Sequence, residues 1–280
     1  MTNTDFLKAV DFLDLEASAF QAIQHIFPCE TELLDKVPLE RIVQHFQKDL
    51  TPAPHPFLIR VAGQSGSGKS SQLVPAIQDA LHNQSYIKIN VGAFAPFHPR
   101  YPEWQATYPD QMREKTNGFA LRALVMFYKH CILQKVNVVL DMTLLEPEID
   151  LYLMTLAKKM GYKIQANILC VPKKISDMFI HLRQLETGRY VKPSSSSYFF
   201  KALAPSLKAL VHSGLFDQKD DLILWAHDLM HPIQKTHLNN PAVTRVLESY
   251  RGTHFKIRKA KALLNAKKRW MKLFMEEKYV

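Results

Sequence analysis

The stretch FLIRVAGQSGSGKSSQLV, residues 57–74, decides the fold of this protein. FLIRVA (57–62) is a short apolar run bounded by Pro56 and Gly63, and such a run predicts a buried strand. GQSGSGKS (63–70) fits the pattern Gly-x4-Gly-Lys-Ser/Thr, and a helical pattern follows it over 69–82. A strand, a glycine-rich loop and a helix in this order predict a P-loop, whose backbone N–H groups surround nucleotide phosphates.

The loop supplies nine candidate nucleotide-binding residues. Lys69 would bring a positive charge to the β and γ phosphates, and the Ser70 hydroxyl would ligate Mg²⁺. The expected cofactors are therefore ATP or GTP together with Mg²⁺. The alternative is a Gly/Ser loop with an incidental lysine, which the strand before it and the helix after it disfavour. The nine residues are Gly63, Gln64, Ser65, Gly66, Ser67, Gly68, Lys69, Ser70 and Ser71.

Short apolar runs alternate with helical patterns along the rest of the chain. Further strands are expected at 86–90, 136–141, 163–171 and 221–226, and helices at 117–134, 148–160, 173–187 and 196–212. This alternation predicts an α/β fold of the P-loop kinase type, with a parallel five-stranded sheet and helices on both faces. The prolines of TPAPHP (51–56) separate a helical N-terminal extension (1–54) from the kinase domain (55–230). A basic helical C-terminal extension (231–280) follows.

The positive charge of the chain gathers at its end. The net charge is +10, and residues 245–280 hold 11 Lys and Arg against 3 Asp and Glu. A basic helix with Trp270 and Met271 beside three cations would suit an anionic partner, either nucleic acid or a membrane surface. The plainer interpretation is a helix that packs on its own domain with its lysines in water. The sequence leaves these interpretations open.

Composition narrows the class of protein. Apolar residues make up 47% of the chain, which excludes global disorder, and the 3 cysteines show no metal-binding spacing. The N-terminus carries acids where a signal peptide needs basic residues, and no run approaches the roughly 18 apolar residues of a membrane span. We therefore expect a cytoplasmic protein without a transmembrane segment. Secretion by a non-classical route would leave no mark in these patterns.

Several segments of the chain, in this order and spacing over roughly residues 55–230, resemble the zeta-toxin family of P-loop kinases. Members of this family phosphorylate the sugar 3′-hydroxyl of UDP-N-acetylglucosamine in bacterial toxin–antitoxin systems. The resemblance implies ATP- or GTP-dependent transfer of the γ-phosphate to a hydroxyl of a nucleotide sugar, and an antitoxin protein as a partner. The segments are GQSGSGKSS, INVGAFAPFHPRYPEWQATYP (89–109), VNVVLDMTL (136–144), LRQLETGRY (182–190) and SLKALVHSGLF (206–216).

The resemblance also assigns roles to individual residues. Asp141 stands where the family has a Glu after its third strand, so it is expected to hold Mg²⁺ with Ser70 or to act as the base. Arg183 and Arg189 match two arginines that the family places on the γ-phosphate. With Lys69, these three are the expected catalytic residues. The plainer interpretations are a helix cap for Asp141 and a solvated helix face for the arginines.

The chain departs from the family on the acceptor side. The family's second strand ends with two aspartates one residue apart, and the second of them is the base. Here those positions are Asn90 and Gly92, and Leu145 stands where an arginine often follows the third strand. Asn90 and His98 are the expected substrate-binding residues, although a His-Pro pair is also typical of a turn.

Loss of a general base typically costs ~10²–10⁴-fold in rate, so it would cripple the family reaction without ending nucleotide binding. Two alternatives to the family reaction follow from this departure. One is a nucleotide-binding module whose catalytic function is altered. The other is a kinase with a different acceptor, either a nucleic-acid end or a dinucleotide.

Overall fold

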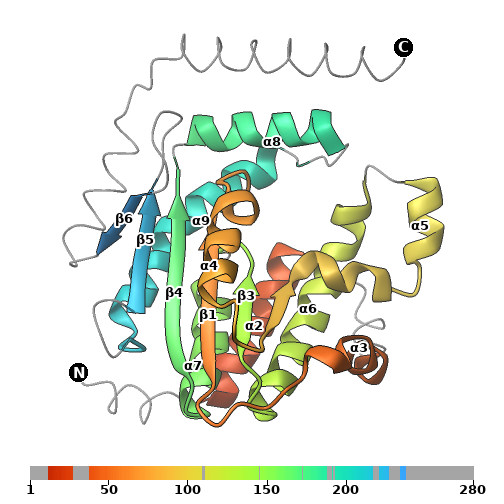
Figure 1. Cartoon of the computed structure of the whole chain (residues 1–280). Helices are drawn as coiled ribbons and strands as arrows, with labels where there is room; N and C mark the ends of the chain where they lie inside the picture. The colour runs from red at the N-terminus through yellow and green to blue at the C-terminus, as the bar shows by residue number, and fades with distance from the viewer. Residues whose placement is uncertain are drawn as a thin grey trace, which may run out of the picture.

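The computed structural model describes residues 12–27, 38–108, 111–144, 146–171, 173–187, 191, 193–216, 221–226 and 234–237. A six-stranded sheet in the order β2-β3-β1-β4-β5-β6 forms its centre (Figure 1). The first five of these strands run parallel to one another, which confirms the predicted α/β fold. The strands are β1 (Phe57–Gly63), β2 (Ile87–Asn90), β3 (Val138–Asp141), β4 (Lys163–Cys170), β5 (Leu222–Ala226) and β6 (Gln234–His237).

The last strand, β6, lies where the sequence predicts a helix. It pairs antiparallel with β5, from Ile223 opposite His237 to Ala226 opposite Gln234. The helical prediction for 231–280 is therefore wrong at 234–237. A strand of 4 residues is too short to show a periodicity, and the free edge of β5 decides its conformation. The basic stretch 245–280 lies outside the described residues, and the domain boundaries at 54 and 230 stay predictions.

Helices cover both faces of the sheet, as its alternating side chains require. Leu58 and Ala62 of β1 belong to the larger apolar cluster, whereas Val61 of β1 and Val139 of β3 belong to the smaller one. The larger cluster includes α2 (Phe12–Ile26), α3 (Leu39–Phe46), α6 (Met112–Leu133), α7 (Pro147–Lys159) and α9 (Pro193–His212). The smaller cluster includes α4 (Val74–Ala80), which lies in front of the sheet in Figure 1.

Helix α2 of the N-terminal extension belongs to the body of the domain. Its Ala19 and Ile23 are buried, and its Glu16 accepts hydrogen bonds from Lys129 Nζ and Tyr152 Oη, each at 2.9 Å. These contacts join α2 to α6 and α7, behind the sheet in the view of Figure 1. α2 therefore packs on the face of the sheet opposite to α4.

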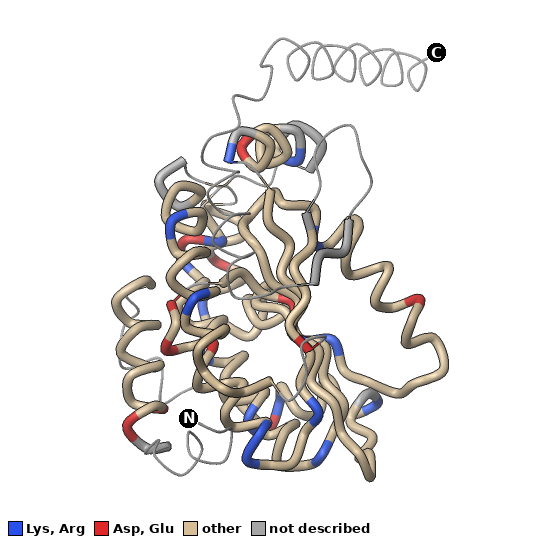
Figure 2. The backbone as a smooth tube through the Cα atoms, turned by 90° about the vertical axis from the view of Figure 1, so that its left-hand side faces the viewer, with Lys and Arg blue, Asp and Glu red and all other residues tan. Residues whose placement is uncertain are grey.

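The remaining elements surround the carboxyl ends of the strands. They are the short helices η3 (Lys69–Leu73), η4 (Val91–Phe97) and α5 (Tyr101–Thr107), and the longer α8 (Lys173–Thr187). The short helix η2 (Gln47–Asp49) is different, because it leads into residues 52–53, which pair with residues 135–136 ahead of β3. Most Lys, Arg, Asp and Glu residues lie on the helices and at the ends of the strands (Figure 2). Among the described residues, no helix combines the length and the hydropathy needed to cross a bilayer.

Candidate nucleotide site

The loop between β1 and η3 has the tight conformation that its glycines predict. Gly63, Gly66 and Gly68 have φ angles of +142°, +75° and +95°, a region that side-chain-bearing residues rarely adopt. A Cβ atom on Gly63 would lie 2.2 Å from the carbonyl oxygen of Leu169. The neighbouring strand β4 therefore leaves room only for glycine at the start of the loop.

Helix α8 packs directly on this loop, across the carboxyl end of the sheet (Figure 1). Ser176 Oγ donates a hydrogen bond to the carbonyl oxygen of Ser65, and a Cβ atom on Gly66 would lie 2.3 Å from the carbonyl oxygen of Ser176. Arg183 Nη2 lies 3.4 Å from Ser65 Oγ. The structure thus brings Arg183 to the P-loop, whereas Arg189 lies outside the described residues.

Lys69 lies in an environment with an excess of positive charge. Its Nζ donates to the carbonyl oxygens of Gly63 and Gln64, at 2.7 and 3.0 Å. The pKa of Lys69 is lowered from 10.5 to about 8, mainly because the ammonium is buried; the carboxylate of Asp141 opposes this shift, and nearby arginine charges add to it. An excess of cations in a partly desolvated cleft attracts a polyanion such as a triphosphate. Arg113 and Arg183 contribute to this positive charge, and Arg60 acts on the pKa of Lys69 while its own charge is paired with Asp150.

Sequence reasoning missed two of these arginines. Arg60 is the charged residue in the middle of the apolar run 57–62, and that interruption was its only signal in the sequence. Arg113 belongs to the first turn of α6, where a charged residue is ordinary, so nothing in its local sequence marks it. Both come near Lys69 only through the tertiary fold.

Asp141 and Asn90 lie side by side at the end of the sheet. Asp141 pairs in register with Asn90 of β2 and Val61 of β1, and its position two residues after Val139 places its side chain on the α4 face. Asp141 is 8% exposed, and its carboxylate accepts no hydrogen bond from the described part of the chain. Such a carboxylate is suited to bind a cation or a water molecule.

The side chain of Asn90 has a structural task of its own. Its Oδ1 accepts a hydrogen bond from the backbone N–H of Ala93 at 3.2 Å and caps η4. Gly92 follows on the exposed side of this turn, and a Cβ atom added to it would lie 3.3 Å from Asn90 Oδ1. The position where the family resemblance places a base therefore carries no side chain.

His98 is enclosed between η4 and α5. Its side chain is 2% exposed, its Nδ1 accepts a hydrogen bond from the backbone N–H of Arg100 at 3.0 Å, and its ring stacks on Trp104 with the centroids 4.4 Å apart. These contacts fix the turn that follows η4. Binding of substrate by His98 stays a prediction.

The site fits a magnesium ion that arrives with the nucleotide. No group of three His, Cys, Asp or Glu residues that could hold a metal occurs within the described ranges. Mg²⁺ usually keeps several waters and binds through one or two protein ligands and substrate phosphates, so it needs no such group. The carboxylate of Asp141, which accepts no hydrogen bond from the described residues, and the exposed Ser70 at the start of η3 meet that smaller requirement.

Comparisons with known proteins agree with this architecture. The model of the family described as "Zeta toxin" matches residues 42–229. A structure from the PezAT chromosomal toxin–antitoxin system of Streptococcus pneumoniae superposes with a TM-score of 0.65 at 18% identity, covering 88% of this chain and 98% of that one. No curated protein sequence matches the chain.

Two structures of a second complex also match. AvrRxo1-ORF1 with AvrRxo1-ORF2 and ATP gives a TM-score of 0.56 at 15% identity, covering 77% of this chain and 73% of that one. The same pair with sulphate ions gives a TM-score of 0.53 at 16% identity, with 75% and 71% covered. At these identities the superpositions show a shared fold.

Proposed function

Because the chain belongs to the zeta-toxin family, we propose that it is a phosphotransferase that uses ATP or GTP with Mg²⁺. One observation carries this proposal: the tight glycine loop that follows β1 holds Lys69, and Asp141 ends the neighbouring strand β3, in register with Val61 just before that loop. Phosphoryl transfer depends mainly on positioning and on neutralising charge, and a half-buried cation near a carboxylate provides both. The ATP-bound AvrRxo1-ORF1 complex supports ATP as the nucleotide.

Each described residue at the loop has a distinct task in this proposal. Lys69 exchanges the carbonyl oxygens of Gly63 and Gln64 for phosphate oxygens. Mg²⁺, when bound, would neutralise charge on those oxygens, and Ser70 and Asp141 would hold it. Arg183, next to Ser65, is placed to stabilise charge that develops on the γ-phosphate. We assign the same task to Arg189.

For the acceptor, we propose a hydroxyl group of a nucleotide sugar such as UDP-N-acetylglucosamine. Asn90 would form a hydrogen bond with a hydroxyl but cannot take its proton, and Asp141, next to it in the sheet, is the alternative base if Mg²⁺ is held without it. The PezAT match comes from a toxin–antitoxin system, which supports an antitoxin as a partner. The free thiols of Cys131 and Cys170 are consistent with the reducing cytoplasm.

The absence of a side chain at Gly92 favours a second candidate function. With no carboxylate at this position, the cleft would bind nucleotide and act weakly or not at all on the family's substrate. A nucleotide-binding module with altered chemistry, or a kinase for a nucleic-acid end or a dinucleotide, satisfies that observation. The basic C-terminal stretch would then recruit the anionic partner.

Phosphate transfer from γ-labelled ATP to a panel of nucleotide sugars, dinucleotides and RNA ends separates these functions. A kinase labels one class of acceptor, and the Lys69→Ala variant abolishes that labelling. The matched control is Lys163→Ala, which removes an exposed lysine at the opposite end of the sheet and leaves labelling unchanged. Tight Mg²⁺-dependent ATP binding without transfer to any acceptor would favour the non-catalytic module.

A further inference from the structure

Arg60 lies at an unusual place for a charged residue. It occupies the middle of the central strand β1, and its side chain is 0% exposed. Alternation along the strand turns it, with Leu58 and Ala62, toward the face that α7 covers. There its Nη2 pairs with Asp150 Oδ1 of α7 at 2.7 Å, and the Asp150 side chain is also 0% exposed. Apolar residues would fill this space without the cost of desolvating two charges, so burial alone does not explain the pair.

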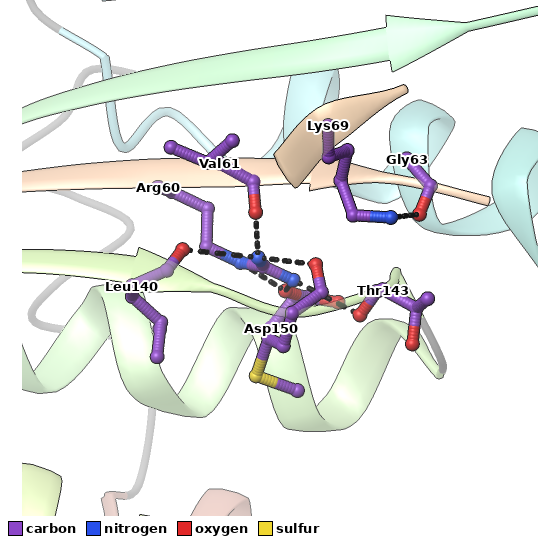
Figure 3. Close-up of polar contacts among 8 residues, drawn as sticks. Arg60, Val61, Gly63, Lys69, Leu140, Thr143 and Asp150 are labelled. Carbon is purple, nitrogen blue, oxygen red and sulfur yellow. Dashed lines mark hydrogen bonds and ion pairs between the residues drawn. The ribbon is translucent and has the colours of Figure 1, made fainter. Parts of the chain in front are cut away.

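The guanidinium of Arg60 uses all five of its N–H donors (Figure 3). Asp150 Oδ1 accepts from Nε at 2.9 Å and from Nη2 at 2.7 Å. The carbonyl oxygen of Thr143 accepts from Nη2 at 3.1 Å, and those of Val61 and Met142 accept from Nη1 at 2.7 and 2.8 Å. The carbonyl oxygen of Leu140 lies 3.4 Å from Nη1. The aspartate thus fixes the plane of the guanidinium, which reaches toward the end of β3.

These bonds hold the backbone on both sides of Asp141. β3 ends at Asp141, and one more ladder bond, from Met142 N to Val61 O at 3.2 Å, follows it. Among the described residues, no backbone N–H donates to the carbonyl groups of Met142 and Thr143, and Arg60 donates to both. Where β3 ends, the side chain of Arg60 therefore takes the place of the backbone hydrogen bonds between strands. It contacts the peptide groups next to Asp141 from the α7 face.

We infer that Arg60 is a positioning residue, which holds Asp141 in the orientation required toward Lys69 and a nucleotide-bound Mg²⁺. The inference rests on the proposed function, because it assumes that Asp141 meets Mg²⁺ there. Arg60 acts through the backbone, since the Asp141 side chain lies on the opposite face of the sheet. Lysine cannot take its place, because an ammonium is a point charge that cannot span Asp150, Val61 and the two carbonyl groups beyond β3.

The test is the effect of Mg²⁺ on ATP affinity, measured by calorimetry on the full chain. In the Arg60→Lys variant the positive charge remains and the fork of donors is lost. ATP affinity without Mg²⁺ should stay within about twofold of the wild-type value, since the P-loop is untouched. The gain in affinity that Mg²⁺ produces should fall about 10- to 100-fold, the usual effect of removing a group that orients a metal ligand.

A second variant separates positioning from stability. Arg60→Met with Asp150→Leu replaces the ion pair by apolar groups, which proteins often tolerate without loss of stability. This double variant should unfold near the wild-type temperature and still lose the gain in ATP affinity that Mg²⁺ produces. The matched control is Ile149→Val, which shortens a buried side chain of α7 next to Asp150, lowers the unfolding temperature and keeps the full gain.

Three results would overturn the inference. The first is that Mg²⁺ raises the ATP affinity of both Arg60 variants as much as that of the wild type, which would show that Arg60 contributes only to packing. The second is loss of cooperative unfolding in both variants, which would assign the ion pair to fold stability alone. The third is a wild-type chain whose ATP affinity does not respond to Mg²⁺ at all, and this result would remove the proposed function as well.

Discussion

The affinity for ATP should fall as the pH rises through about 8, because Lys69 loses its proton there. Burial lowers the pKa of Lys69 to about 8 in the free protein, and a bound phosphate raises it again by favouring the ammonium form. Binding therefore takes up protons wherever the free lysine is neutral. By linkage, the affinity is at its full value below the free-state pKa and is lost above it.

The size of the effect follows from that pKa. About three quarters of the protein carries protonated Lys69 at about pH 7.5, and about a tenth does at about pH 9. Replacing a charged hydrogen bond by a neutral one weakens binding by roughly 10- to 100-fold. The affinity should therefore drop about four- to eightfold between these pH values. A lysine with an ordinary pKa would change its protonated fraction by only about 3% over the same range.

Calorimetry in buffers of different ionisation enthalpy measures both the affinity and the proton uptake. The control is Lys69→Arg, because a guanidinium stays charged at every pH up to about 12 and should give a flat profile. An affinity that stays constant in the wild-type protein, or that declines equally in Lys69→Arg, would show that Lys69 is not the titrating contact.

Two further predictions concern glycines. Gly92→Asp should raise transfer to UDP-N-acetylglucosamine by ~10²-fold or more, because it places a carboxylate where the family resemblance has its base. Gly92 does not have a positive φ, so the new side chain causes no backbone strain. Unchanged transfer of the label would contradict the prediction. Gly66→Ala should cost about 1–3 kcal/mol of unfolding free energy, because its Cβ atom would lie 2.3 Å from Ser176 O. Gly161→Ala is its control, with φ +79° and no atom within 4 Å of the added Cβ, and equal losses in denaturant melts would refute a clash with α8.

Most of the fold could be predicted because its signals are local. The strands β1 to β5 are apolar runs bounded by glycine, proline or charged residues, and their expected limits agree with the structure to within two residues. The segment 91–107 shows where this reasoning fails. No helix is expected there from the sequence, yet the segment forms η4 and α5, because Asn90 caps the first and Pro102 occupies the opening turn of the second.

The sequence by itself determined the phosphate loop, because the glycine conformations and the lysine lie within a few consecutive residues. The tertiary structure alone decided what surrounds that loop. Parallel pairing of β1, β2 and β3 places Asp141 between Asn90 and Val61, and packing of α7 supplies Asp150 to hold Arg60. Such neighbours come from strands and helices far apart in the chain, and no periodicity records which of them will meet, because periodicity reports only which face of its own element a residue occupies.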